Sequence, residues 1–310
     1  MEKKSKKEQV KELTERLEQG VREVFTSGAY ENYLKVMSKF HRYSFRNTVL
    51  IWQQNPAATY VAGFDAWKND FKRYVKKGEK AIRIFAPTEY TVPQQKQVID
   101  PVTKLPMVDA QGKPVMETVD VKRRGFMATS VFDISQTDGQ ELPELVKKLD
   151  GKVENYDAML EAIKSVSPVQ VEFGYTGEAD GYYSARDEKI VISDFLGPTQ
   201  TILAVLHEVT HAKLHNPEMS PKEKKTKEVE AESVAYVVCQ KYGIMTGDNS
   251  FGYIASWSQD KELPELKASL QVISKTANSM IKDIDKKLEE LLGNKEKASV
   301  MDTLEENKDR

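Results

Sequence analysis

The sequence has few cysteines and no long apolar run. Cys239 is the one cysteine in 310 residues, which excludes an internal disulfide framework and fits a reducing cytosol. No uncharged apolar stretch approaches the length of a transmembrane helix, and the basic start is not followed by an apolar signal segment. The net charge of −2 gives no general bias toward nucleic acid or membrane. We therefore expect a cytoplasmic protein without a membrane partner, in which any nucleic-acid site is a local patch.

The length of the chain suits two domains. Turn-forming and charged residues cluster near residue 140 without helical or strand periodicity, which indicates a boundary. We predict an α+β protein with a first domain over 1–140, a second over 141–295 and a charged tail over 296–310. Residues 88–120 are rich in Pro, Gln, Gly, Asp and Lys, and they predict a flexible insertion in the first domain.

Apolar spacing predicts the secondary structure of both domains. In the first domain we expect helices over 6–27, 30–40 and 44–52, and strands over 60–61, 81–85 and 121–131. In the second we expect helices over 143–149 and 154–166, a strand over 169–173, a strand hairpin over 179–184 and 189–193, a histidine-bearing helix ended by Asn216-Pro217, a glutamate-rich helix over 228–242 and a long helix over 263–292. Cys239 lies in an apolar helical run and is expected in the core.

Three of the four histidines lie between Ile202 and His215, in the stretch that contains His207-Glu208-Val209-Thr210-His211. In this H-E-x-x-H pattern two imidazoles four residues apart face the same side of a helix and can hold one Zn²⁺ ion. Glu208 lies about 100° further round the helix and can act on water as a general base. A chance match on a solvated helix is the alternative. The apolar residues before the motif and the carboxylate-rich helix after it favour a metal site.

A catalytic zinc site needs three protein ligands and one open position. His215 lies ~12 Å along the helix axis from His207, too far to share an ion. Glu228 and Glu232 are four residues apart on one face of the next helix, whereas Glu230 points to another side. We expect Glu228 to bind the metal and Glu232 to orient a ligand histidine, with the exchanged assignment left open. These ligand types do not separate Zn²⁺ from Mn²⁺.

The run Glu228-Val229-Glu230-Ala231-Glu232 resembles the second motif, E-x-x-A-[N/D/E], of gluzincin-like metallopeptidases such as the ImmA/IrrE group. Glutamate stands at position 232, where Asn or Asp is commoner in that group. The resemblance implies a zincin-like metallopeptidase domain built from the strand hairpin, the histidine helix and the glutamate helix, followed by the long C-terminal helix. In such a site Zn²⁺ activates a water, Glu208 removes its proton, and Glu208 then protonates the leaving amine.

Basic residues outnumber acidic ones between Lys68 and Arg83, and aromatic residues are interleaved with them. This pattern suits phosphate contacts combined with base stacking, although a solvated basic turn around core aromatics is the alternative. Our candidate DNA-binding residues are Arg42, Tyr43, Arg46, Asn47, Trp67, Lys72, Arg73, Lys76, Lys77 and Lys80.

The stretches 41–47, 54–67, 75–84 and 131–137 resemble, in their order and in their residues, the N-terminal domain of ArdC-type antirestriction proteins. In that family this domain binds single-stranded DNA and precedes a zinc metallopeptidase-like domain, in proteins of mobile elements. The resemblance implies an antirestriction-type protein that binds single-stranded DNA and cleaves an unknown protein substrate.

Two other functions fit the same residues. In the first, the chain masks DNA and its zinc domain is structural or inactive. In the second, it is an ImmA-like peptidase that cleaves a repressor, and its N-terminal domain recruits protein. The oligomeric state is not predicted by the sequence.

Overall fold

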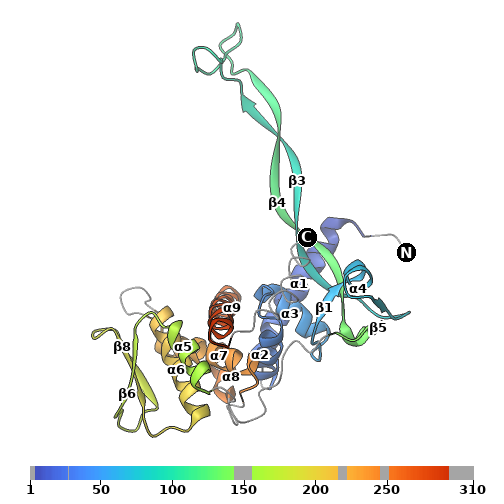
Figure 1. Ribbon diagram of the computed structural model, residues 1–310. Coiled ribbons are helices and arrows are strands. Elements are labelled where there is room, and N and C mark those ends of the chain that lie inside the picture. Colours follow the sequence, from blue (N-terminus) through green and yellow to red (C-terminus); the bar gives the residue numbers. More distant parts are fainter. Residues whose placement is uncertain (1–3, 27, 143–155, 216–221, 245–250, 293–310) are drawn as a thin grey trace. The chain divides into compact units, whose positions relative to one another are not determined.

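The computed structural model describes residues 4–26, 28–142, 156–215, 222–244 and 251–292 (Figure 1). Helices and strands both contribute to it, so the predicted α+β class is confirmed at this level. Contacts divide the chain into two compact units, of which one comprises Met1–Leu13 and Phe85–Thr129 and the other Thr14–Ile84 and Ser130–Arg310. Within the described residues no helix has both the length and the apolar character needed to cross a membrane.

The first three helices are α1 (Lys6–Val24), α2 (Ala29–Lys39) and α3 (Phe45–Gln54). Their ends lie within a few residues of the predicted ones, because apolar spacing and turn residues mark them directly in the sequence. Gly28 precedes α2 with a φ of 79°, a left-handed conformation that glycine adopts without steric cost. Ser44 caps α3, since its side chain accepts a hydrogen bond from the backbone N–H of Asn47.

A three-stranded sheet, a pair of short strands and two short helical segments follow these three helices. Strands β1 (Val61–Gly63), β4 (Met116–Asp133) and β3 (Ile82–Gln97) form a sheet in the order β1-β4-β3, and β2 (Arg73–Val75) pairs antiparallel with β5 (Thr137–Gly139). Between β1 and β2 lies α4 (Phe64–Asn69), and between β4 and β5 lies the single turn η1 (Ile134–Gln136). Trp67 of α4 is buried in a small core with Ala62 and Phe71. This core joins α4 to β1.

Strands β3 and β4 are longer than predicted and extend into the 88–120 segment as a long two-stranded ribbon (Figure 1). The expected strand ends near residues 85 and 121 are therefore wrong for this segment. Most side chains from Thr88 to Lys96 are exposed, so the ribbon has no buried face to impose an apolar alternation. That alternation is the signal on which the strand prediction depends. The flexibility expected of this segment stays a prediction.

The second half of the chain contains a small sheet and five α-helices in its described part. These elements are α5 (Tyr156–Ser165), β6 (Gln170–Gly174), β7 (Gly181–Ser184), β8 (Lys189–Ser193), α6 (Pro198–Leu214), α7 (Lys224–Lys241), η2 (Phe251–Tyr253), α8 (Ile254–Ser258) and α9 (Leu263–Leu292). The sheet order is β6-β8-β7, with β8 parallel to β6 and antiparallel to β7. The predicted strand hairpin over 179–193 is confirmed, and β7 is its outer strand.

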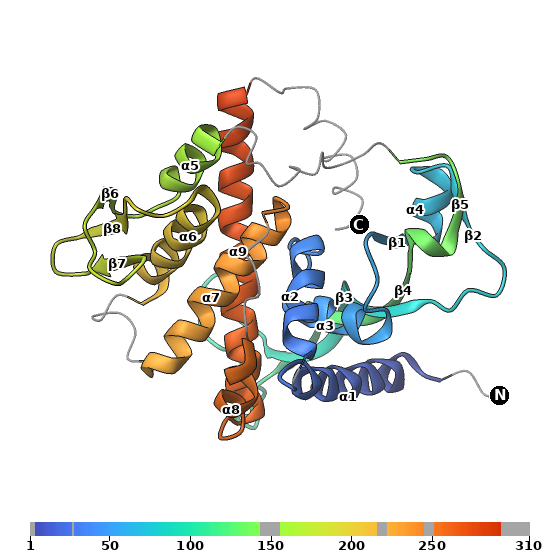
Figure 2. The same ribbon diagram turned by 90° about the horizontal axis from the view of Figure 1, so that it is seen from below.

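Helix α7 packs against both α6 and α9, and the three helices form the core of this half (Figure 2). One stripe of α9 is fully buried, including Leu270, Ile273 and Ile281, as the spacing predicts. Cys239 of α7 is also fully buried, in agreement with its expected place in the core. The helix predicted over 143–149, the break at Asn216-Pro217 and the tail over 296–310 lie outside the described residues.

Helix α2 contacts α7 through two hydrogen bonds that join residues about 200 positions apart. The hydroxyls of Tyr30 and Ser233 are 2.7 Å apart in a buried contact, and the Tyr236 hydroxyl donates to Glu31 at 3.0 Å. The glutamate-rich helix is therefore held on one side by the N-terminal part of the chain. The domain boundary expected near residue 140 stays a prediction.

We expect Tyr30→Phe to lower the free energy of unfolding by about 1 to 3 kcal/mol, because it leaves the buried Ser233 hydroxyl without its partner. The double variant Tyr30→Phe/Ser233→Ala removes both polar groups and should be less destabilised than the sum of the single variants. Urea unfolding measures these differences. The control is Tyr74→Phe, which alters a 60% exposed tyrosine. A Tyr30→Phe variant as stable as the wild-type protein would contradict this account.

Candidate metal centre

Helix α6 presents the H-E-x-x-H residues on its less buried side. The helix begins at Pro198, a residue suited to the first helical position. Apolar residues such as Val205 and Val209 are fully buried on one side, whereas His207 and His211 are partly accessible. The packing that fixes the helix in the core thus turns both imidazoles toward α7.

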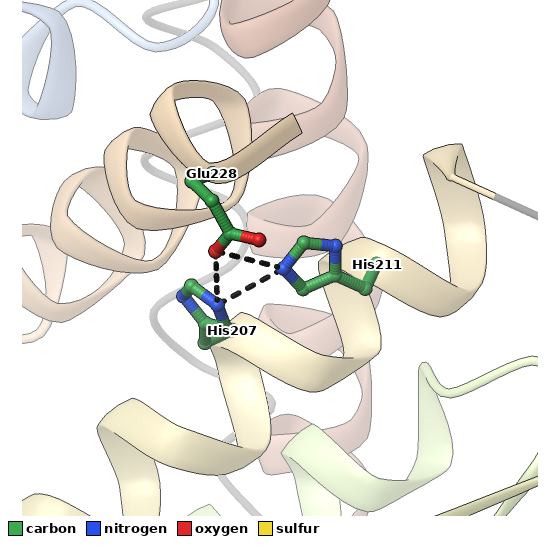
Figure 3. A group of neighbouring side chains, drawn as sticks. All are labelled: His207, His211 and Glu228. Carbon is green, nitrogen blue, oxygen red and sulfur yellow. Dashed lines mark hydrogen bonds and ion pairs between the residues drawn. The ribbon is translucent and has the colours of Figure 1, made fainter. Parts of the chain in front are cut away.

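The structure brings His207, His211 and Glu228 together, with their ligand atoms facing one another (Figure 3). The two histidine Nε2 atoms are 3.0 Å apart, and Oε2 of Glu228 lies 3.4 Å from Nε2 of His207 and 3.5 Å from Nε2 of His211. Ligands about 2.0 to 2.1 Å from one tetrahedral zinc ion are separated by ~3.4 Å. The three donors therefore fit one face of such a coordination sphere. Within the described residues they form the one His/Cys/Asp/Glu group of this kind.

Glu228 is held in its anionic form. Hydrogen bonds from His207 and then His211 hold the pKa of its carboxyl well below the usual range. An ionised carboxylate beside two imidazoles is a donor set that zinc and other divalent first-row metals accept.

Glu208 lies beside these residues, outside the group of three donors. Burial raises the pKa of its carboxyl, and the neighbouring His207 and His211 partly offset that effect. The backbone of Tyr183 in β7 hydrogen-bonds to the same carboxylate. A Cβ atom at Gly181 would lie 2.7 Å from Cδ1 of Ile192 and 3.4 Å from Cγ of Glu208, so glycine allows β7 to approach the α6 side chains. A general base needs such a position, partly buried and beside the residues that could hold a metal ion.

Glu232, which we expected to orient a ligand histidine, makes a different contact. Its carboxylate accepts a hydrogen bond from the hydroxyl of Tyr253. The nitrogen of His211 that faces away from Glu228 contacts His215 instead, with 2.9 Å between the two Nδ1 atoms. His215 thus lies beside the ring nitrogen of His211 that an orienting residue would contact, and the orienting role expected of Glu232 stays a prediction.

A buried network behind His211 was missed by the sequence prediction. Nε2 of His215 lies 3.0 Å from Oε2 of Glu230, and the Lys222 ammonium donates to both oxygens of Glu230 at 2.8 Å. The side chains of His215 and Glu230 are only 2% and 1% exposed. One available signal was the third histidine in register with the other two. The other was the position of Glu230 directly between Val229 and Ala231.

The candidate DNA-binding aromatics differ in exposure. Trp67 is fully buried and its indole N–H donates to the carbonyl of Phe132 at 2.9 Å. Its predicted role as a surface for base stacking is therefore excluded in this structure, because the ring is part of the core. Tyr43 is partly buried, and its hydroxyl donates to the carbonyl of Val61 at 3.3 Å. Tyr74 of β2, at 60% exposure, is accessible.

Several of the candidate basic residues donate hydrogen bonds to neighbouring segments of the chain. The Arg73 guanidinium donates to Thr137 and to the carbonyl of Gln140, so it fastens β2 to β5. The Lys76 ammonium donates to the carbonyl of Ser135 at 3.0 Å. The Lys72 ammonium donates to the carbonyl of Asn69. Lys76 is exposed, as are the other basic candidates Arg42, Arg46, Lys72, Lys77 and Lys80. Asn47 is partly buried, in the first turn of α3.

The N-terminal part of the chain matches a known domain family. Residues 3–132 match the family described as the N-terminal domain of anti-restriction factor ArdC. Over 328 aligned positions the chain is 30% identical to an uncharacterised protein of Bacillus anthracis, and the match covers 94% of this chain and 54% of that protein. The chain thus spans about half the length of this relative.

Two solved structures are also similar to the chain. They are crystal structures of the antirestriction ArdC protein from the R388 plasmid, one metal-free and one Mn(II)-bound. Each is 21% identical to this chain, with TM-scores of 0.44 and 0.45. The alignments cover 81% and 82% of this chain and 86% of the solved chain.

Proposed function

We propose that this chain, whose residues 3–132 match the family described as the N-terminal domain of anti-restriction factor ArdC, is an antirestriction-type protein of mobile elements. It combines single-stranded DNA binding with zinc-dependent peptide hydrolysis. The observation that carries the hydrolytic part is the group of His207, His211 and Glu228 with Glu208 beside it. The division into a DNA-binding domain over 1–140 and a zincin-like domain over 141–295 belongs to the same proposal.

The proposed metal ligands are His207, His211 and Glu228. Their mutual distances of 3.0, 3.4 and 3.5 Å fit a tetrahedral zinc ion. A bound zinc ion supplies Lewis acidity, which polarises a peptide carbonyl and makes water acidic enough to ionise near neutral pH.

Glu208 is the proposed general base and general acid. Its carboxylate removes a proton from the attacking water, and the resulting carboxylic acid gives that proton to the leaving amine. The raised pKa caused by burial helps this carboxyl to hold the proton between the two steps. Strand β7 is an edge strand of its sheet, and the backbone of Tyr183 in β7 hydrogen-bonds to Glu208. We therefore assign to β7 the alignment of an extended peptide substrate by strand addition.

The DNA-binding part of the proposal rests on the family match over residues 3–132 and on exposed side chains between residues 72 and 80. Lys72, Lys77 and Lys80 are exposed, and Tyr74 offers an accessible ring on β2. Ammonium groups near an exposed aromatic ring suit the phosphates and bases of a single strand.

We expect Lys77→Glu/Lys80→Glu to weaken binding to a labelled single-stranded oligonucleotide about tenfold or more at low salt, because two phosphate-facing charges are reversed. The slope of log affinity against log salt should fall by ~1.4, or 0.7 for each lost phosphate contact. Fluorescence anisotropy over a salt series measures both values. The control is Lys282→Glu/Lys286→Glu, which reverses two exposed charges on α9. Equal binding by both double variants, or no binding by the wild-type protein at low salt, would refute the DNA site.

The hydrolytic part is tested with a peptide library derived from a bacterial proteome, analysed by mass spectrometry. Zinc-loaded wild-type protein should produce defined cleavages that a chelator stops and added zinc restores. DNA binding without any cleavage would favour the alternative in which the chain masks DNA and its metal domain is inactive.

A further inference from the structure

The long ribbon of β3 and β4 (Figure 1) leaves one edge of β4 without a partner strand. Strand β1 pairs with β4 only at residues 131–133, and within the described residues no other strand lies along the same edge over 116–129. Backbone N–H and C=O groups therefore point outward along this part of β4. A two-stranded ribbon alone is only marginally stable in water, and further strands stabilise it. The exposed side chains of Tyr90, Val92 and Phe126 add apolar surface that a partner would cover.

The two edges of the ribbon differ in their ability to pair with a further strand. Strand β3 contains Pro87 and Pro93, which have no N–H and fit a sheet only where that group would point away from the neighbouring strand. These prolines interrupt the row of donors on the outer edge of β3. Strand β4 contains no proline. Its free edge therefore keeps the alternating donors and acceptors that another strand needs.

The charges along β4 are arranged in an order that fits a second copy of the same segment. Acidic residues come first, at Glu117 and Asp120, and the basic residues Lys122, Arg123 and Arg124 follow. All five are exposed, and Glu117, Asp120 and Lys122 have no ion-pair partner within the described residues. Charges on an edge normally prevent pairing. In an antiparallel pair of two copies, however, the acidic part of each strand meets the basic part of the other.

The hydrogen-bond pattern restricts how two identical edges can pair. Residues whose N–H and C=O groups point outward must face each other, so odd-numbered residues lie opposite odd-numbered ones and even opposite even. The register centred on Val121 places Asp120 of each copy opposite Lys122 of the other, which gives two pairs of opposite charge. The neighbouring registers are unfavourable, because a centre at Asp120 or at Lys122 brings two like charges directly opposite each other.

We propose that the edge of β4 over residues 117–125 pairs with the same edge of a second copy of this chain, in an antiparallel dimer centred on Val121. The two ribbons then form one four-stranded sheet, in which both copies use the same surface, as two-fold symmetry requires. Acidic and basic residues are almost equal in number between residues 85 and 129, which favours a protein partner over nucleic acid for this edge. The inference goes beyond the proposed function and depends neither on the metal site nor on DNA binding.

The first test is sedimentation equilibrium of the full-length protein over a concentration series, which measures the equilibrium between monomer and dimer. We expect Asp120→Lys and Lys122→Asp each to weaken dimerisation about tenfold or more, because each replaces two pairs of opposite charge by two pairs of like charge. The combined exchange Asp120→Lys/Lys122→Asp should restore the dimer. The control is Lys113→Asp, which makes the same change of charge at an exposed residue before β4 and should dimerise like the wild-type protein.

The second test identifies the register by cysteine cross-linking. In the proposed dimer the two copies of residue 121 are directly opposite, with ~5 Å between their Cα atoms, a separation that a disulfide can bridge. Val121→Cys should therefore form a covalent dimer under mild oxidation. The two copies of residue 119 are offset by four residues, or ~14 Å, so Val119→Cys should form no such dimer. The native Cys239 is fully buried in α7, so it should not take part.

The outcomes decide between this dimer and its alternatives. A wild-type protein that stays monomeric at every concentration would overturn the inference, and weaker oligonucleotide binding by Lys122→Asp in such a monomer would assign the edge to nucleic acid. A dimer that forms equally well in both single charge variants would place the contact elsewhere on the chain and refute the pairing of β4. Cross-linking of Val119→Cys as readily as Val121→Cys would refute it as well. Circular dichroism of each variant verifies that the exposed substitutions leave the fold intact.

Discussion

Glu208→Gln is expected to retain zinc and to lose peptide hydrolysis by about 10²- to 10⁴-fold, the usual contribution of a general base. The amide is nearly the same size as the carboxylate but cannot take a proton from water. Glu208 is not one of the three clustered donors, so the metal content should stay equal to that of the wild-type protein. The rate is measured on a peptide that the wild-type protein cleaves, and the metal by elemental analysis of the same samples.

The matched control for Glu208→Gln is Glu223→Gln, which neutralises a carboxylate at the N-terminal end of α7 that is paired with Lys261. This variant should keep both zinc and hydrolysis. Full hydrolysis by Glu208→Gln would show that another group removes the proton. Loss of zinc together with hydrolysis would show that Glu208 is needed for the metal site itself.

Glu228→Gln is expected to weaken zinc affinity more than ~100-fold, beyond the 10- to 100-fold that follows the loss of an outer partner. It removes the anionic donor that faces both His207 and His211. The matched control is Glu232→Gln, one turn further along α7, where the carboxylate contacts Tyr253. This control should change zinc affinity by much less.

Chelator competition on both glutamate variants distinguishes the two possible ligands directly. A larger loss in Glu232→Gln than in Glu228→Gln would establish the exchanged assignment that the sequence leaves open. Equal and small losses would show that neither carboxylate is a ligand and that the two histidines bind the metal with other donors.

The sequence by itself determined the features that depend on local spacing. The bounds of α9, the strand hairpin before α6 and the shared face of His207 and His211 all follow from periods of 2 and 3.6 residues. The preference for Glu228 over Glu232 as the third ligand also came from the sequence, since a site with two histidines needs a third donor and both glutamates lie on one face of the next helix. Each of these features depends on residues that are close in the chain, or on two helices whose apolar periodicity shows which faces meet.

Only the tertiary structure decided the contacts that join distant segments. Burial of Trp67 depends on β1 and the end of β4, with Phe132 as its partner. The bond between His215 and Glu230 depends on how α6 crosses α7. Periodicity tells which face of an element is apolar, but it does not tell which polar groups meet across an interface. A charged residue such as Glu230 can be buried because its partners come from other parts of the chain, and the fold alone brings them together.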